Sequence, residues 1–140
     1  MKNLRSVLLA LTVLLLATAA HAQTTNVQAN IPFDFVVGDR AYPAGDYTVK
    51  SMAIDSAAIR IDNPDESAKG VTLSNACEKA LPATQTTLVF QRLGDNYFLY
   101  QVWTKGSSSG REFPMSKAEV KIAKNYGNPE LVIVAANISH

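Results

Sequence analysis

The stretch from Val27 to Val37 reads VQANIPFDFVV, and larger apolar side chains occupy every second position in it. The apolar positions are Val27, Ala29, Ile31, Phe33, Phe35 and Val37. A period of two is typical of a β-strand that has one face in a core and the other face in polar surroundings. Proline lacks the N–H that a sheet ladder requires, so Pro32 predicts that this strand lies at a sheet edge or contains a bulge.

Similar short runs continue along the chain, separated by turn residues. Residues 38–40 and 43–46, GDR and PAGD, predict turns, because proline presets one backbone dihedral and glycine tolerates positive φ. Hairpin-type turns are also predicted at residues 62–66 and 94–96. Strands this close in sequence usually pair as antiparallel neighbours, which predicts a meander. The further strands are expected at Tyr47 and Val49, Ile59 and Ile61, Val71 and Leu73, Leu88 and Phe90, and residues 97–104.

One helix is predicted late in the chain, after the glycine- and serine-rich loop at residues 106–110. Ser116 and Glu119 have the spacing of a capping box, and Gly127 is suited to end the helix. A strand is the alternative, since apolar and charged residues also alternate over residues 118–122. A closing strand is expected at residues 131–136.

Together these elements predict a mainly β fold with one short late α-helix. Short strands at hairpin spacing favour an antiparallel β-barrel or closed β-sandwich, a meander of about seven or eight strands. The sequence shows no internal repeat, no low-complexity tail and no sign of a second domain, so we expect residues 23–140 to form a single domain.

Residues 1–22 have the features of a secretory signal peptide. Lys2 and Arg5 precede an uncharged run of 14 residues at 7–20, and small side chains at Ala20 and Ala22 suit a signal peptidase. Cleavage is therefore expected just before Gln23. A membrane anchor is the alternative, but a helix needs roughly 20 apolar residues to span a bilayer. We expect an exported protein, in the periplasm or outside the cell, with no stable membrane insertion after cleavage.

The expected mature chain has 118 residues, enough to bury roughly two thirds of its unfolded surface without a metal or disulfide. Its 11 basic and 12 acidic side chains nearly balance, which argues against nucleic acid as a partner. Cys77, the single cysteine, cannot close an intramolecular bridge. Its spacing from Val71 and Leu73 favours a buried thiol, and a bridge to another chain is the alternative.

The sequence predicts no catalytic, cofactor-binding or metal-binding residue. After cleavage the one remaining histidine is the terminal His140, and a frayed terminus cannot position an imidazole for catalysis or zinc. The acids of residues 62–66 favour a solvated turn over a calcium site. The alternative of a hydrolytic centre is kept, because two acids that are far apart in the sequence can meet in the folded protein. Lys117, Lys121 and Lys124, with Arg111 upstream, are interpreted as a solvated helical face, with anionic lipid or polymer as the alternative.

The strand at residues 97–104 has aromatic side chains at positions of both parities. Strict alternation would place Tyr97 and Trp103 on one face and Tyr100 on the other. Two apolar faces require a second cover, which would be the late helix, a protein partner or a small apolar ligand. Tyr97, Tyr100 and Trp103 are therefore the candidate ligand or partner surface.

Several segments together form a recognisable pattern: IPFDFVVG at 31–38, PAGDYTV at 43–49, LVF at 88–90, GDNYFL at 94–99, VWT at 102–104, GRE at 110–112 and residues 116–119. This pattern resembles a family of small exported bacterial proteins of unassigned function. The resemblance covers most of the mature chain and implies export and a shared fold, but no catalytic residue. The predicted order of elements also resembles a lipocalin-type barrel, although no Gly-x-Trp signature occurs.

These patterns predict an exported, non-catalytic envelope or secreted module with a binding or structural role. The alternatives are a lipocalin-like binder of a small apolar ligand and a carboxylate-dependent hydrolase. Neither the ligand nor the partner is specified by the sequence.

Overall fold

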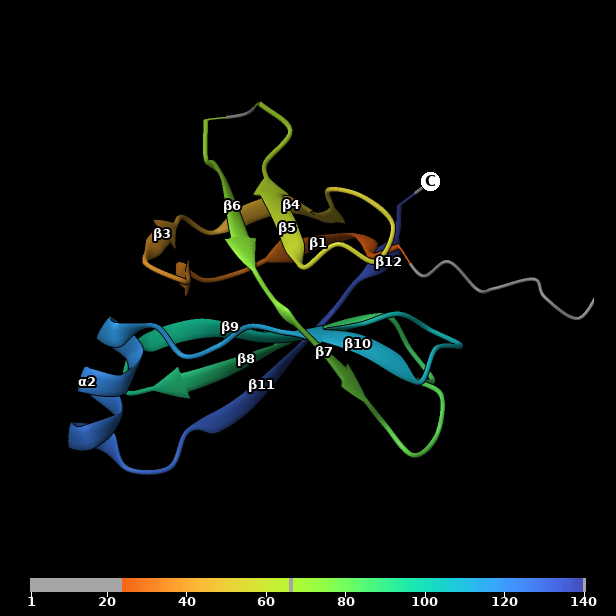
Figure 1. Cartoon of the computed structure of the whole chain (residues 1–140). Helices are drawn as coiled ribbons and strands as arrows, with labels where there is room; N and C mark the ends of the chain where they lie inside the picture. The colour runs from red at the N-terminus through yellow and green to blue at the C-terminus, as the bar shows by residue number, and fades with distance from the viewer. Residues whose placement is uncertain (1–23, 66, 140) are drawn as a thin grey trace, which may run out of the picture.

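Two β-sheets face each other in the computed structural model, which describes residues 24–65 and 67–139 (Figure 1). The first sheet has the order β12-β1-β4-β5-β6. Its strands are β1 (Asn26–Ile31), β4 (Gly45–Ser51), β5 (Ala58–Asp62), β6 (Lys69–Leu73) and β12 (Asn137–Ile138). The second sheet has the order β11-β8-β9-β10-β7, and β2 joins it beside β9 with β3 as its neighbour. Its strands are β2 (Phe35–Val37), β3 (Arg40–Tyr42), β7 (Asn75–Glu78), β8 (Thr87–Leu93), β9 (Asn96–Trp103), β10 (Ser109–Glu112) and β11 (Glu130–Ala135).

The predicted mainly β fold is confirmed, and the two facing sheets fit its sandwich form. The described residues contain twelve strands, more than expected, because the chain crosses between the sheets inside segments that look continuous in sequence. The predicted strand at residues 27–37 is the clearest case. β1 ends at Ile31, directly before Pro32, and the chain resumes as β2 in the other sheet. Pro32 thus ends a strand, and the expectation of one continuous strand, at a sheet edge or with a bulge, was wrong.

Half of the strand pairs in the described residues join antiparallel neighbours in sequence, as the meander prediction requires. The pairs β2–β3, β4–β5, β5–β6, β8–β9 and β9–β10 follow this rule. Five pairs depart from it. β2 pairs with β9 in parallel at Val36 and Phe98, and the antiparallel pairs β1–β4, β1–β12, β7–β10 and β8–β11 join strands that are not consecutive in sequence. In the second sheet, β2 and β11 flank the hairpin of β8 and β9, which local spacing did predict.

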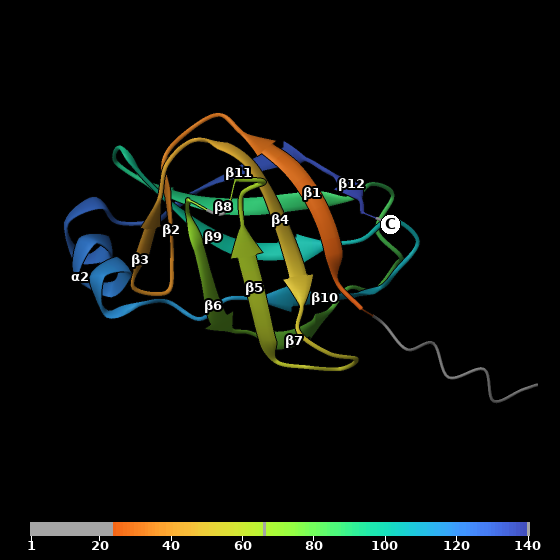
Figure 2. The ribbon, with the colours of Figure 1, turned by 90° about the horizontal axis from the view of Figure 1, so that it is seen from above.

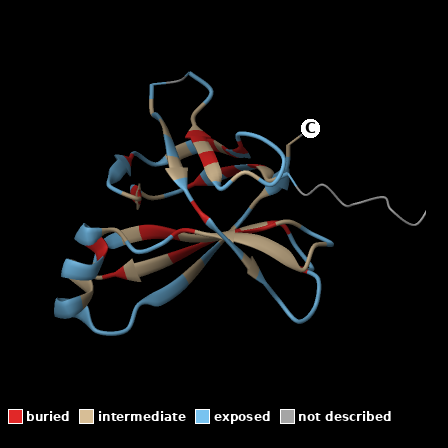
Figure 3. Cartoon of the chain, in the orientation of Figure 1, coloured by how far each residue is buried: buried red, intermediate tan, exposed pale blue. Residues whose placement is uncertain are grey.

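Aromatic rings fill the space between the sheets. Phe35 stacks on Tyr42 with ring centroids 5.2 Å apart, and it meets Tyr47 and Phe90 edge-on at 5.0 and 5.6 Å. Apolar residues of β1, β4, β5 and β8 complete the same cluster. Figure 3 shows buried segments on the strands of both sheets, whereas the loops and most of the helix are exposed. These rings occupy the position in which a lipocalin-type barrel would hold its ligand.

The late helix is α2 (Lys117–Tyr126), and it lies at one end of the sandwich (Figure 2). The Glu119 N–H donates to Ser116 Oγ at 3.1 Å, and the Glu119 carboxylate accepts from the Ser116 N–H. Gly127 follows with a φ of 73°. The predicted capping box and stop are confirmed, and the alternative of a strand is excluded for these residues. Within the described ranges, no helix has the length and hydrophobicity that crossing a bilayer requires.

Candidate functional site

A β-bulge in β9 decides where its aromatic side chains point. Phe90 of β8 pairs with Leu99, but the adjacent Val89 pairs with Gln101, so Tyr100 is an extra residue on β9. A bulge shifts the alternation of the residues that follow it by one position. Val102 therefore faces the core, as Leu99 does before the bulge.

The prediction that Tyr97 and Trp103 share a face was therefore wrong. Tyr97 lies on the inner side, where its ring stacks on Phe33 at 3.8 Å. Trp103 lies on the outer side in a second apolar cluster with Val89. The three candidate residues, Tyr97, Tyr100 and Trp103, do not form one continuous surface.

The cover over Trp103 is a loop, which was not among the three covers considered from the sequence. Residues 79–86 connect β7 to β8 and place Ala83 against Trp103, with Lys79 Nζ 4.1 Å from the ring centroid. Backbone hydrogen bonds fix this loop: the Ala83 N–H donates to the Ser107 carbonyl at 2.8 Å, and the Ala83 carbonyl accepts from the Gly106 N–H. Trp103 is only 2% exposed, so its role is packing.

A polar network borders this outer cluster. The Trp103 indole N–H donates to Gln101 Oε1 at 3.0 Å, and Gln101 Nε2 donates to Glu112 Oε1 at 3.1 Å. A hydrogen bond with the Glu112 carboxylate raises the pKa of Tyr100, and burial adds to that rise. Burial also raises the pKa of the half-buried Cys77 thiol, and the Glu112 charge acts in the same direction. These groups stabilise β7, β9 and β10 and do not form an activated nucleophile.

Hollows lie near the entry of the described chain into β1, at the end of the sandwich that Figure 1 shows opposite α2. Two adjoining hollows there have volumes of about 450 and 300 Å³ and share Thr25, Ser109 and Gly110. Thr25 precedes β1 of the first sheet, whereas Ser109 and Gly110 belong to β10 of the second, so the space lies between the sheets. The larger hollow is lined by Thr24, Thr25, Pro82, Val102 and residues 104–110. The smaller is lined by Thr25, Ser51, Asp55, Ser56, Ala76 and residues 109–111.

The rim of this inter-sheet hollow is fixed by hydrogen bonds. The Thr25 N–H donates to Ser51 Oγ at 3.1 Å, and the Ser51 N–H donates back to the Thr25 carbonyl at 2.7 Å. Ser74 fixes the guanidinium of Arg111. Arg111 Nε donates to Ser74 Oγ at 2.9 Å, and Arg111 Nη2 donates to the Ser74 carbonyl at 3.0 Å. Ser74 is buried and lies where the chain passes from β6 to β7. A guanidinium is thus positioned at a solvent-accessible hollow.

This position corrects the interpretation of Arg111 as an extension of the lysine face. Lys117, Lys121 and Lys124 are exposed on α2, at the opposite end of the sandwich. Arg111 is half-buried in β10.

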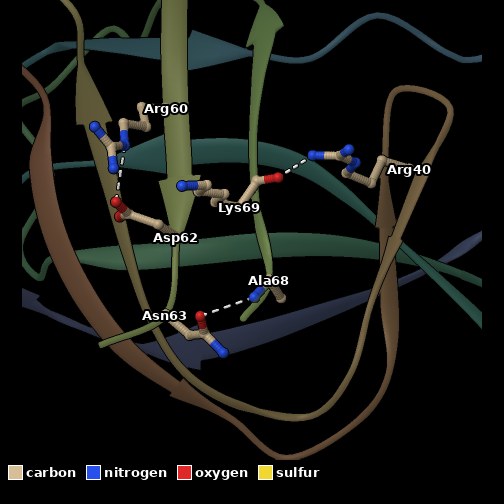
Figure 4. A network of polar contacts seen from close by, with 6 residues as sticks. All are labelled: Arg40, Arg60, Asp62, Asn63, Ala68 and Lys69. Carbon is tan, nitrogen blue, oxygen red and sulfur yellow. Dashed lines mark hydrogen bonds and ion pairs between the residues drawn. The ribbon is translucent and has the colours of Figure 1, made fainter. Parts of the chain in front are cut away.

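The acidic turn after β5 uses its polar groups locally (Figure 4). Asp62 pairs with Arg60 at 2.8 Å on the outer face of the first sheet, and Asn63 Oδ1 accepts from the Ala68 N–H at 3.0 Å. Asp65 accepts two hydrogen bonds from Ser67, which lower its pKa. Within the described part of the chain, no group of three or more His, Cys, Asp and Glu side chains is placed to hold a metal ion.

Comparison with known proteins gives no match: no family model, no curated protein and no solved structure matches the chain. The resemblance to an exported bacterial family therefore stays a prediction, as does the signal peptide. Ala20, Ala22, Gln23 and His140 lie outside the described residues.

Sequence reasoning missed the inter-sheet hollow because its walls come from five separated segments. Residues 24–25, 51–56, 76, 82 and 102–111 meet only after both sheets have formed. The one local signal was the Gly-Ser-Ser-Ser-Gly run at 106–110, which the sequence marks as a loop and which supplies much of the lining.

Proposed function

We propose that this chain is an exported, non-catalytic β-sandwich module that binds a small polar ligand in the inter-sheet hollow. One observation carries the proposal: residues with hydroxyl groups from both sheets line a hollow beside the fixed guanidinium of Arg111. Its two parts fall within the range of about 300–1,000 Å³ that is typical of small-molecule sites.

The composition of the lining favours binding over hydrolysis. Asp55 is the only carboxylate among the residues that line the two hollows. A carboxylate-dependent hydrolase needs two acids that converge on one bond. Serine and threonine hydroxyls in the lining have no imidazole beside them to act as a base. The serine and threonine hydroxyls of the same lining are hydrogen-bond donors and acceptors, as a binding site for a polar molecule requires.

A polar ligand suits this site better than the apolar ligand considered from the sequence. The apolar interior is filled by the rings of Phe35, Tyr42, Tyr47 and Phe90. The hollow itself is lined mainly by threonine, serine and glycine, with Pro82 and Val102 as apolar exceptions.

A structural role is the second candidate, and the edge strand β11 favours it. Leu131 and Ile133 on its outer face are 58% and 68% exposed. Exposed apolar side chains on an edge strand are typical of contact surfaces. This candidate predicts a protein partner, whereas the hollow predicts a small ligand.

Native mass spectrometry of the protein released from its own host separates the two. The ligand proposal predicts a retained small molecule that is lost in Ser108→Trp, which fills the hollow, and kept in Lys121→Trp on α2. Equal retention by both variants, or a mass that contains only the polypeptide, contradicts it. A retained second protein that is lost in Ile133→Lys would support the structural role.

A further inference from the structure

The orientation of Arg111 indicates which chemical group the smaller part of the hollow receives. Its two hydrogen bonds to Ser74 use Nε and Nη2, and the Nη1 group has no protein partner within the described residues. Because Ser74 is only 3% exposed, this anchor holds the guanidinium before any ligand arrives. A preorganised guanidinium loses little conformational entropy on binding, and its planar N–H groups suit a carboxylate.

Hydroxyl groups complete the surroundings of this cation. Ser51, Ser56 and Thr25 approach from the first sheet, and Ser109 from the second. Hydroxyls donate to anionic oxygens and add charge-assisted hydrogen bonds to the arginine contact.

Asp55 gives the same hollow a negative charge. A plain anion such as phosphate therefore meets repulsion as well as attraction there. A ligand that carries N–H donors beside its carboxylate can pair the carboxylate with Arg111 and donate hydrogen bonds to Asp55.

The larger part of the hollow fits the remainder of such a ligand. Ser108 and Ser109 line it with hydroxyl groups, which can exchange hydrogen bonds with the N–H and C=O groups of an extended peptide. Pro82 and Val102 provide apolar contacts for small side chains.

We infer that the hollow binds a short peptide with small side chains, whose free C-terminal carboxylate contacts Arg111 and whose N–H groups contact Asp55. This inference rests on the proposed function, because it names the ligand class of the same site.

The test compares three probes on the wild-type protein: tri-alanine, tri-alanine with an amidated C-terminus, and inorganic phosphate. Backbone amide shifts from NMR give both the affinity and the location. Tri-alanine should shift the amides of residues 109–111, the amidated peptide should bind at least tenfold more weakly, and phosphate should bind more weakly than tri-alanine. Equal binding of the amidated peptide, or tighter binding of phosphate, overturns the inference without any change to the protein.

Three variants give an independent readout. Arg111→Gln should weaken tri-alanine at least tenfold, whereas Arg92→Gln, at the far end of β8, should leave binding unchanged. Because Arg111→Gln also removes the anchor to Ser74, Asp55→Asn provides a second measurement: it should weaken tri-alanine and strengthen phosphate. Unchanged affinities in Asp55→Asn would count against the inference.

The outcomes also distinguish this inference from the proposed function. A molecule retained from the host that binds in the hollow but is insensitive to Arg111→Gln and Asp55→Asn overturns the peptide inference alone. If neither tri-alanine nor any retained molecule perturbs the lining residues, both are wrong.

Discussion

The indole N–H of Trp103 donates a hydrogen bond to the side-chain oxygen of Gln101, two positions earlier on β9, at 3.0 Å. The two side chains therefore project from the same outer face of the second sheet, and Val102 between them faces the core. Gln101 in turn donates to Glu112 on the neighbouring strand β10. The most aromatic strand of the chain is thus held by an outer network as well as by the inner core.

Trp103→Ala should reduce the free energy of unfolding by about 3–5 kcal/mol, because it removes a fully buried aromatic ring from a packed cluster. Trp103→Phe is the matched control: it keeps an aromatic ring but leaves Gln101 Oε1 without its donor, at a cost of about 1–3 kcal/mol. Urea denaturation measures both values. A loss below about 1 kcal/mol in Trp103→Ala would mean that this ring is not a packing residue.

Gly110→Ala should destabilise the fold by steric overlap. A Cβ at this position would lie 2.6 Å from the Val102 carbonyl oxygen and 2.7 Å from Trp103 Cε3, and the first of these is backbone that cannot move freely. Overpacking of this kind costs about 1–3 kcal/mol. Ser108→Ala in the preceding loop is the control and should stay within about 0.5 kcal/mol of the wild type. Equal unfolding midpoints for the two variants would show that the strands move apart at no cost.

The fold could be predicted as far as local patterns determine it. Alternation located most strands, and the capping residues located α2, because both signals depend on residues a few positions apart. The division of residues 27–37 between two sheets was not predicted. Alternation continues through Pro32, since Ile31 and Phe35 face the same interior from opposite sheets. The alternation indicates which residues are buried, but it does not indicate which sheet each residue joins.

The candidate site was less predictable than the fold. Arg111 was grouped with the lysines that follow it, but its partner Ser74 is 37 positions earlier in the sequence. The faces of β9 were assigned by strict alternation, and one extra residue, Tyr100, reversed the second half. Bulges and long-range side-chain anchors leave no periodic signal, so both had to come from the structure.

The proposed export predicts where the mature polypeptide begins. The exported polypeptide should begin at Gln23, with the mass of the intact product lower by residues 1–22, because small residues at 20 and 22 suit signal peptidase. Replacement of Ala22 by a large residue such as Phe should slow this processing, and Thr25→Phe should not. Intact mass spectrometry of the periplasm and medium checks both. A full-length product that retains Met1 in the membrane fraction would contradict cleavage.

The thiol of Cys77 should react slowly in the folded protein. It is half-buried beside Trp103, and burial raises its pKa, so little thiolate is present at neutral pH. Its reaction with a disulfide reagent such as DTNB at pH 8 should be at least tenfold slower in the native protein than in urea, a factor on the order of one pKa unit together with shielding. Equal rates, or a disulfide-linked dimer under non-reducing conditions, would favour the alternative of a bridge between chains.

Glu119 should make the stability of the protein decline as the pH rises above the acidic range. Glu119, in the first turn of α2, is 5% exposed, and burial raises the pKa of its carboxyl, which the hydrogen bond from the Ser116 N–H only partly opposes. A raised pKa means that the folded state binds the proton more tightly than the unfolded state, whose value is near 4.5. The stabilising contribution is therefore complete below that value and is lost as the pH rises through the higher pKa of the folded state.

Glu119→Gln, which stays neutral, should resemble the wild type at pH 4 and become relatively more stable towards pH 7. Urea midpoints for both proteins across this range measure the effect, with Glu130→Gln on exposed β11 as the control. Parallel pH profiles for the wild type and Glu119→Gln would show that the carboxylate of Glu119 is not destabilised by its burial.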